Sequence, residues 1–189
     1  MPNWCCTNIK LKGKEADIEA FMKKHIINDE FDFETVIPFP NTKEECDPTF
    51  IVASAQDAHI SEDPNRPWFN WYKWSLVNWG TKWNASSTSY LEDFISFQTA
   101  WSPPVPIYNA LVKQHPELDF EFVYAEEQVA VYTGKYIASK GSFTSVIDYK
   151  SESKEAFELY FEIWGGEEDF IFDPKINTYV LQEDYEEEN

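Results

Sequence analysis

The sequence contains few cysteines and no long apolar run. Its three cysteines are an odd number, and Cys5 and Cys6 are adjacent, which suits neither a disulfide framework nor a zinc site. No window approaches the roughly 20 apolar residues of a membrane-spanning helix, and the first residues hold no apolar stretch of signal-peptide length. These absences argue against a disulfide-stapled secreted domain and against an integral membrane protein, and they predict a cytoplasmic location.

Basic side chains are also scarce. The chain has 15 lysines and arginines against 34 aspartates and glutamates, a formal net charge of −19. Such a charge repels phosphate backbones and anionic bilayers, so direct nucleic-acid binding and membrane binding are disfavoured. A basic protein partner is compatible with it. The alternative is that the charge only keeps an aromatic-rich protein soluble.

Apolar and aromatic residues are plentiful, at 43% and 17% of the 189 residues, so the chain is globular despite its charge. Its first part predicts a strand, a helix and a strand. Residues 4–12 mix β-branched, aromatic and polar side chains, as strands do. Ile18, Phe21 and Met22 then recur with the spacing of one helical face. In residues 31–37 apolar side chains alternate with a period of two, which predicts another strand.

The same order of elements returns later, with a strand at 93–101, a helix at 105–115 and a strand at 118–124. Two βαβ units in tandem form the split arrangement of the ferredoxin-like fold, in which two helices cover one face of an antiparallel sheet. We therefore expect an α+β ferredoxin-like domain over residues 1–150.

Two segments lie outside the repeated units. Residues 41–92 form an insertion between them, which contains a tryptophan-rich helix at about 68–79. Residues 151–189 predict a C-terminal helix, with Ser153 as its cap, and an acidic tail, packed on the same domain or extending it.

Four motifs resemble those of the YubB-type ferredoxin-like family, small proteins of plasmids, phages and bacterial genomes. They are MPNWCCTNIKLKG at the start, NWGTKWN at 78–84, FQTAWSPP at 97–104, and FVYAEE followed by Gly134. The family has no established activity, so the resemblance implies a fold and a mobile-element origin without a reaction. Similar proteins often carry Asp where this chain has Asn84, which removes a carboxylate from any acid–base role at that position. The chain has no cysteine cluster that could hold an iron–sulfur centre.

Five of the eight tryptophans fall within residues 68–84, WFNWYKWSLVNWGTKWN. On a helix, one broad face would contain Trp68, Trp71, Tyr72, Leu76 and Trp79. Such a face could lie across the sheet as a second core, whereas Trp74 and Val77 fall outside it and are expected to be exposed.

The polar turn after this helix is the candidate binding site. Its predicted residues are Asn78, Thr81, Lys82, Trp83, Asn84 and Trp101. Lys82 would contact an anion, Trp83 and Trp101 would stack on a planar molecule, and the two amides would orient it. Alternatively, the amides cap the helix end and Lys82 pairs with one of the many acids.

Chemistry-bearing motifs are otherwise missing. The three histidines lack metal-ligand spacing, the acidic segment 57–63 is typical of a surface loop, and there is no G-x-S-x-G elbow. We expect no metal, no cofactor and no catalytic residue, which argues against an enzyme. The favoured function is that of an accessory protein, of phage or plasmid origin, which binds a macromolecular partner through an acidic and aromatic surface. The alternative is a small-molecule-binding protein or enzyme with its site at Asn78–Asn84 and Trp101. An exposed sheet edge could also support a homo-oligomer.

Overall fold

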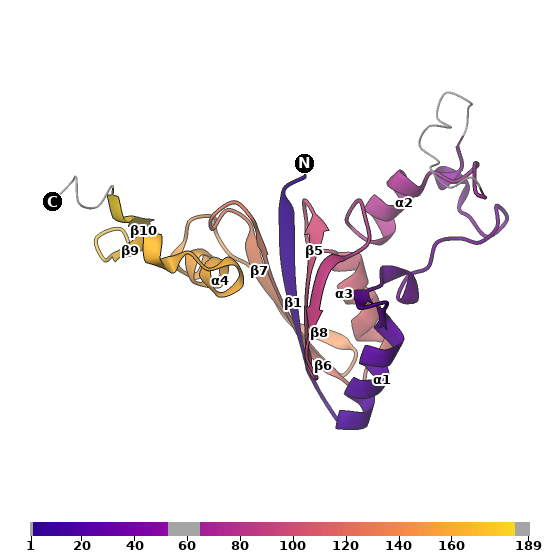
Figure 1. Ribbon diagram of the computed structural model, residues 1–189, viewed down its shortest axis with the longest axis horizontal. Helices are drawn as coiled ribbons and strands as arrows, with labels where there is room; N and C mark the ends of the chain where they lie inside the picture. The colour runs from indigo at the N-terminus through magenta and orange to yellow at the C-terminus, as the bar shows by residue number, and fades with distance from the viewer. Residues whose placement is uncertain (1, 53–64, 184–189) are drawn as a thin grey trace.

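The computed structural model describes residues 2–52 and 65–183 (Figure 1). The end of the predicted acidic tail and the acidic segment 57–63, with His59, lie outside these residues. Within the described ranges, no helix is long and apolar enough to cross a membrane.

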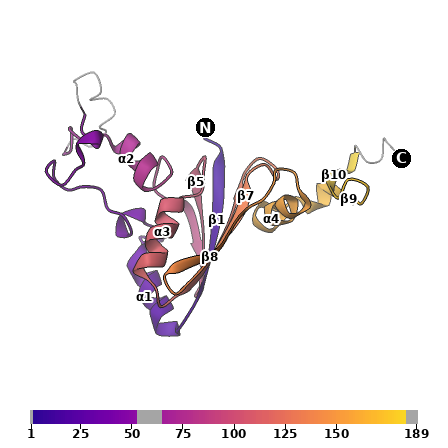
Figure 2. The same ribbon diagram turned by 180° about the vertical axis from the view of Figure 1, so that it is seen from behind.

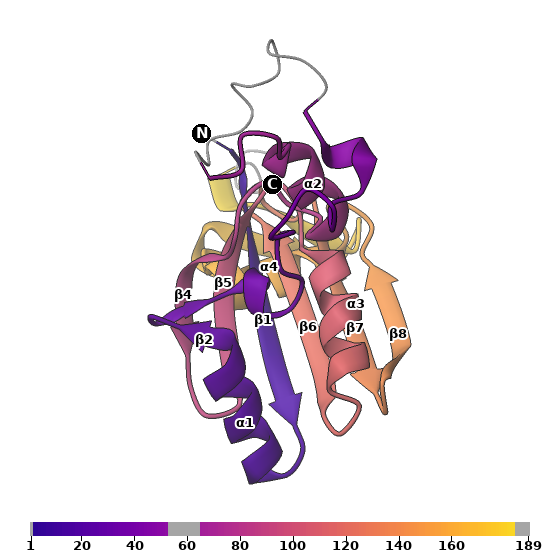
Figure 3. The same ribbon diagram turned by 90° about the vertical axis from the view of Figure 1, so that its right-hand side faces the viewer.

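One six-stranded antiparallel sheet forms the centre of the molecule, in the order β4-β5-β1-β6-β7-β8. Its strands are β1 (Trp4–Lys12), β4 (Ser86–Tyr90), β5 (Phe94–Ala100), β6 (Asp119–Glu126), β7 (Thr133–Ser139) and β8 (Ser142–Asp148). The helices α1 (Glu15–His25) and α3 (Val105–Gln114) cover one face (Figure 3). This arrangement confirms the predicted α+β, ferredoxin-like fold.

The strand predicted at 31–37 is wrong. Only Glu30–Phe31 is extended there, as β3, and it pairs with β2 (Ile26–Ile27) in a short hairpin outside the main sheet. Asp32 accepts a hydrogen bond from the Glu34 amide and begins a 3₁₀ turn over Phe33–Thr35. A side chain that bonds to nearby backbone in this way competes with a strand ladder.

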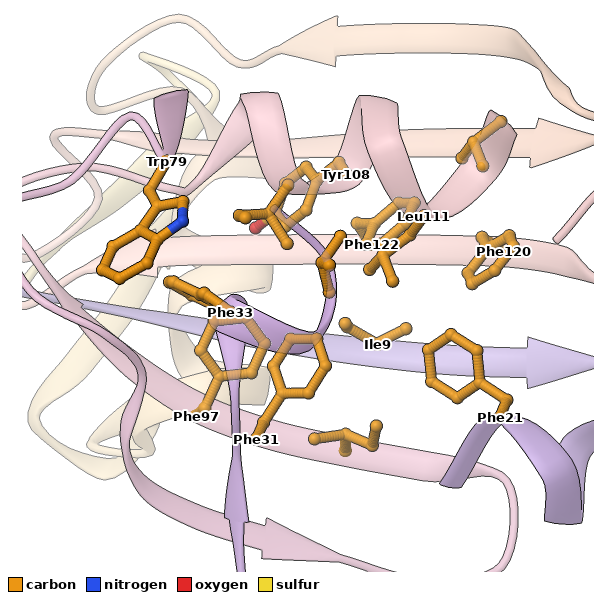
Figure 4. Close-up of a cluster of buried hydrophobic side chains, with 14 of the residues drawn as sticks. Ile9, Phe21, Phe31, Phe33, Trp79, Phe97, Tyr108, Leu111, Phe120 and Phe122 are labelled. Carbon is orange, nitrogen blue, oxygen red and sulfur yellow. The ribbon is translucent and has the colours of Figure 1, made fainter. Parts of the chain in front are cut away.

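The alternating phenylalanines were nevertheless a correct signal of burial. Phe31 and Phe33 are both fully buried and contact Phe97 of β5 under the helical layer (Figure 4). The strand that follows α1 in the main sheet is instead β4, at one edge. Its sequence, SSTSY, is polar because most of its residues are exposed or half-buried, so it lacks the apolar pattern of a strand.

The core lies between the sheet and the helices α1 and α3. Its largest fully buried side chains include Ile9 of β1, Phe21 of α1 and Tyr108 of α3 (Figure 4). The Tyr108 hydroxyl is 2.6 Å from Thr7 Oγ1, so the buried polar atoms of both side chains are paired. The recurring apolar positions of both helices are therefore the faces turned to the sheet.

The opposite face of the sheet carries α4 (Lys154–Trp164), as Figures 1 and 2 show. Ser153 caps this helix by accepting a hydrogen bond from the Ala156 amide, and Gly165 ends it with a φ of 76°. Beyond it lies a hairpin of β9 (Phe170–Asp173) and β10 (Thr178–Leu181). A small second core forms where Phe157 contacts aromatic rings of this hairpin.

A buried histidine pair joins the C-terminal ends of α1 and α3. His25 Nε2 lies 2.9 Å from His115 Nε2, and His25 Nδ1 lies 2.7 Å from Thr35 Oγ1. Burial, assisted by the positive charge of Lys24, lowers the pKa of His25 from 6.5 to about 3. His25 is therefore neutral at neutral pH.

We expect the free energy of unfolding to fall as the pH drops from about 6.5 to about 5. The unfolded chain binds a proton at His25 near pH 6.5, whereas the folded chain does so only near pH 3. The contribution of His25 to the free energy of unfolding is therefore fully present above pH 6.5. At pH 5, protonation of this residue in the unfolded chain lowers the free energy of unfolding by about 2 kcal/mol. Urea unfolding at the two pH values should show that a His25→Gln variant loses less stability on acidification. An equal loss in variant and native protein would contradict the assignment.

Candidate functional site

The tryptophan-rich helix is α2, and it spans only Trp71–Asn78. Asn70 accepts a hydrogen bond from the Lys73 amide, so the helix begins one residue later, at Trp71. The preceding residue, Phe69, forms an isolated β-bridge with Ile51. The helix predicted at 68–79 is therefore shorter, and it lies at one end of the sheet rather than across it (Figure 3).

The predicted buried face of this helix is also wrong. Trp74 is buried, whereas Tyr72 and Leu76 are 37% and 38% exposed. Trp79 is buried as expected, and Val77 is exposed as expected. The cause is the short helix: it packs through its last turn on Phe39 and on the start of α3, so a different arc faces inward.

Part of the tryptophan stretch is therefore core. The rings of Trp74 and Trp79 contact each other and Phe39, and the Trp79 indole donates a hydrogen bond to the Ile37 carbonyl at 2.9 Å. A buried indole needs such an acceptor. These two tryptophans fix the 36–39 segment against α2.

The turn after α2 is anchored to the end of β5. Thr81 Oγ1 donates to the Ala100 carbonyl, and Ser102 Oγ donates to the Gly80 carbonyl, at 2.9 and 2.8 Å. Gly80 has a φ of 80°, and a Cβ atom there would lie 2.7 Å from Pro106, so the turn requires glycine. The predicted proximity of this turn to residues 99–101 is present.

Three of the predicted contact residues use their polar atoms within the fold. Asn78 Nδ2 donates to the Trp74 carbonyl, and Thr81 is fully buried. Asn84 Oδ1 accepts from the Phe33 and Ala85 amides, while its Nδ2 donates to Asp32 Oδ1 at 2.7 Å. Both amides thus make hydrogen bonds within the protein, as the alternative interpretation expected of them, and their orienting role stays a prediction.

The other three predicted residues gather on the surface. Lys82 Nζ lies 4.2 Å from the centre of the Trp83 ring, 5.7 Å from Tyr72 and 5.8 Å from Trp101. The Trp83 and Trp101 rings are nearly parallel with centres 6.5 Å apart, and Trp4 lies on the other side at 6.4 Å from Trp83. Lys82 pairs with no carboxylate among the described residues, so the expected ion pair is absent there.

Trp101 also has an unusual backbone. Its φ of 70° places a bulky residue in the left-handed region, and its amide is held by the Asn3 carbonyl at 2.8 Å. Such a conformation costs about 1–3 kcal/mol and persists only where the surrounding structure imposes it. The Trp101 side chain is 43% exposed, so this strained backbone holds an indole ring at the surface.

A cavity of about 370 Å³ lies beside this cluster. Its walls are formed by Glu34, Phe39, Arg66, Phe69, Trp71, Trp79, Lys82, Trp83 and Asn84. The volume and the aromatic lining are those of a small-molecule pocket. Of the predicted site residues, Lys82, Trp83 and Asn84 line it, whereas Asn78, Thr81 and Trp101 do not.

Two cavity residues that were not among the predicted site residues carry polar groups. The Arg66 guanidinium packs over the rings of Phe39 and Phe69 at 5.3 and 5.7 Å. The indole Nε1 of Trp71 is buried and has no hydrogen-bond acceptor among the described residues. An unpaired buried N–H is destabilising by about 1–3 kcal/mol.

Catalytic and metal chemistry finds no support at this cavity. In the parts of the chain that the structure describes, no group of three His, Cys, Asp or Glu side chains could hold a metal ion.

The sheet and its helices define a ferredoxin-like domain with an aromatic cavity at one end. Residues 78–170 match a family model described as a ferredoxin-like domain in Api92-like protein; the match includes the 80–84 turn and Trp101. The chain also resembles the crystal structure of a protein api92 from Yersinia pseudotuberculosis, with a TM-score of 0.50, 7% identity, and coverage of 79% of this chain and 98% of that one. At this identity the likeness is one of fold. No curated protein matches the chain.

Replacing Asn84 by Asp should destabilise the fold by about 1–3 kcal/mol at neutral pH. The change removes the donor to Asp32 and places two carboxylates within hydrogen-bond distance. Thermal or urea unfolding measures the loss. The swapped pair, Asn84→Asp with Asp32→Asn, restores one donor and one acceptor and should recover most of the stability. A double variant as unstable as Asn84→Asp alone would contradict this role.

Proposed function

We propose that this protein binds a small planar anion, such as an aromatic carboxylate or sulfonate, in the cavity between α2 and the 80–84 turn. One observation carries the proposal: Lys82, which has no carboxylate partner among the described residues, lies in the wall of a cavity lined by aromatic rings. The rings offer faces on which a planar molecule can stack, and Lys82 offers a positive charge.

The electrostatics favour an anion at this place despite the overall charge. Lys82 supplies the cavity with a cation that has no carboxylate partner among the described residues. A cation near low-dielectric aromatic walls interacts more strongly with a ligand than it does in bulk water. An anion can therefore be attracted here even though the protein has a net charge of −19.

The size of the cavity sets the ligand class. A volume of about 370 Å³ is near the lower end for small-molecule pockets, which suits a fused two-ring compound with one acidic group. The favoured sequence-based function, macromolecular binding, is not what this cavity favours, because a concavity of this volume fits a small molecule.

Isothermal titration with naphthalene-1-sulfonate and with the neutral isostere 1-naphthalenemethanol tests the proposal. We expect the anion to bind more tightly. Lys82→Gln should weaken anion binding roughly tenfold, which corresponds to about 1.4 kcal/mol, and leave the neutral compound nearly unaffected. Trp71→Phe shortens the aromatic wall of the cavity and should weaken binding of the anion about fivefold.

Trp68→Phe is the matched control, because Trp68 belongs to the same stretch but does not line the cavity. Its affinity for the anion should equal that of the native protein. Equal binding of both naphthalene compounds, or unchanged affinity in both Lys82→Gln and Trp71→Phe, would rule out this site.

We also propose that this protein is related to the YubB-type proteins. Such a relationship implies an origin in a phage or plasmid and a cytoplasmic location. The motifs NWGTKWN and FQTAWSPP support this, and both lie within the matched residues 78–170. They contain every predicted site residue, so the proposed binding site and the proposed kinship depend on the same part of the chain.

A further inference from the structure

A second hollow lies at the opposite end of the sheet, where β1 leads into α1. It has a volume of about 700 Å³ and runs between α1 and the β4–β5 turn, which Figure 3 shows side by side. Its lining consists of Gly13, Glu15, Ile18, Glu19, Met22, Tyr90, Leu91, Glu92 and Asp93. We call it the α1 groove; it shares no residue with the aromatic cavity.

Four of the residues that line the α1 groove are apolar or aromatic, and we call them its floor. Ile18 and Met22 come from α1, one helical turn apart, Tyr90 is the last residue of β4, and Leu91 begins the β4–β5 turn. Leu91 is 72% exposed, which is unusual for a leucine placed in a concavity. The Tyr90 hydroxyl donates to Asp29 Oδ1 at 2.9 Å, so this ring is held as a fixed wall.

Both rims of the groove are acidic. Glu15 and Glu19 stand one turn apart on α1, and Glu92 and Asp93 stand on the facing turn. None of these four side chains has a hydrogen-bond or ion-pair partner among the described residues, and no lysine or arginine lines the groove. Four unpaired carboxylates around an apolar floor select an occupant that is both apolar and cationic.

We propose that the α1 groove binds an amphipathic helix of a basic partner protein, with an apolar stripe on the floor and lysines or arginines toward both rims. Charge complementarity decides the occupant. A second copy of this chain, with a net charge of −19, and a nucleic acid would both be repelled by the rims. A basic helix is attracted by both rims while its apolar face covers Leu91.

A helix is favoured over an added strand because the nearby sheet edge is already engaged. On β4, the Thr88 amide donates to Glu30 Oε2, and Thr88 Oγ1 accepts from the Phe31 amide. Part of the outer edge of β4 is thus satisfied by the β2–β3 hairpin, whereas the groove offers side chains, which a helix recognises through positions three and four apart.

Fluorescence anisotropy with a labelled 14-residue leucine–lysine peptide tests this. The probe has its leucines at helical spacing; a second peptide of the same composition alternates leucine and lysine, and a third replaces lysine by glutamate. We expect only the first to bind, with an affinity that falls as salt rises. Leu91→Ser, at an exposed position, should weaken it about fivefold.

The charge is tested by a matched pair of double variants. Glu19→Gln with Glu92→Gln should weaken binding about tenfold, whereas Glu167→Gln with Glu168→Gln, exposed residues beyond α4, should not. Both pairs change the net charge equally, so they separate the groove from the overall field. Equal effects of the two pairs, equal binding of the alternating peptide, or an unchanged Leu91→Ser variant would overturn the proposal. The naphthalene titrations do not involve these residues, so the proposal for the α1 groove and the proposal for the aromatic cavity can be disproved independently.

Discussion

The three hydrogen bonds of the Asn84 side chain are the constraint on which the aromatic end of the molecule depends. Two of them tie the segment before β4 to the 3₁₀ turn after β3, two parts of the chain about 50 residues apart, and the third is made to the neighbouring Ala85 amide. That connection holds Phe33 where its ring contacts Trp79, and it fixes the turn that brings Glu34 to the cavity wall. The hydrogen bonds of the Asn84 side chain, rather than an apolar contact, therefore shape a site whose walls are mostly aromatic.

The sequence predicts the central strands β1, β5 and β6 and the covering helices because their residues follow simple periodicities, whereas the polar edge strand β4 carries no such signal. It predicts β3 and the α2 face incorrectly for one shared reason: local side-chain caps, by Asp32 and Asn70, interrupt the pattern. Of the site, the sequence identifies Lys82 and Trp83, since a polar turn between tryptophans is a local signal. Arg66 becomes part of the site only in three dimensions, and Trp71, which the sequence assigns to a buried helix face, instead lines the cavity.

The strand β1 connects the two proposed binding surfaces. Trp4 at its first residue stands beside Trp83, and Gly13, just beyond its last residue, lines the α1 groove. Nine extended residues span roughly 30 Å, so occupants of the two surfaces would not touch. The molecule thus has an aromatic cavity with a cation at one end and an acidic groove at the other. The net charge alone does not reveal this distribution.

The pairing of β1 with β6 also has a consequence for synthesis. Cys5 lies opposite Glu126, so the first strand stays without one of its two neighbours until residue 126 has left the ribosome. At about 5–20 residues per second, that delay is on the order of 5–20 seconds. During it, the aromatic side chains of the first half have no completed sheet to pack on, and mutual repulsion between nascent acidic chains opposes their aggregation.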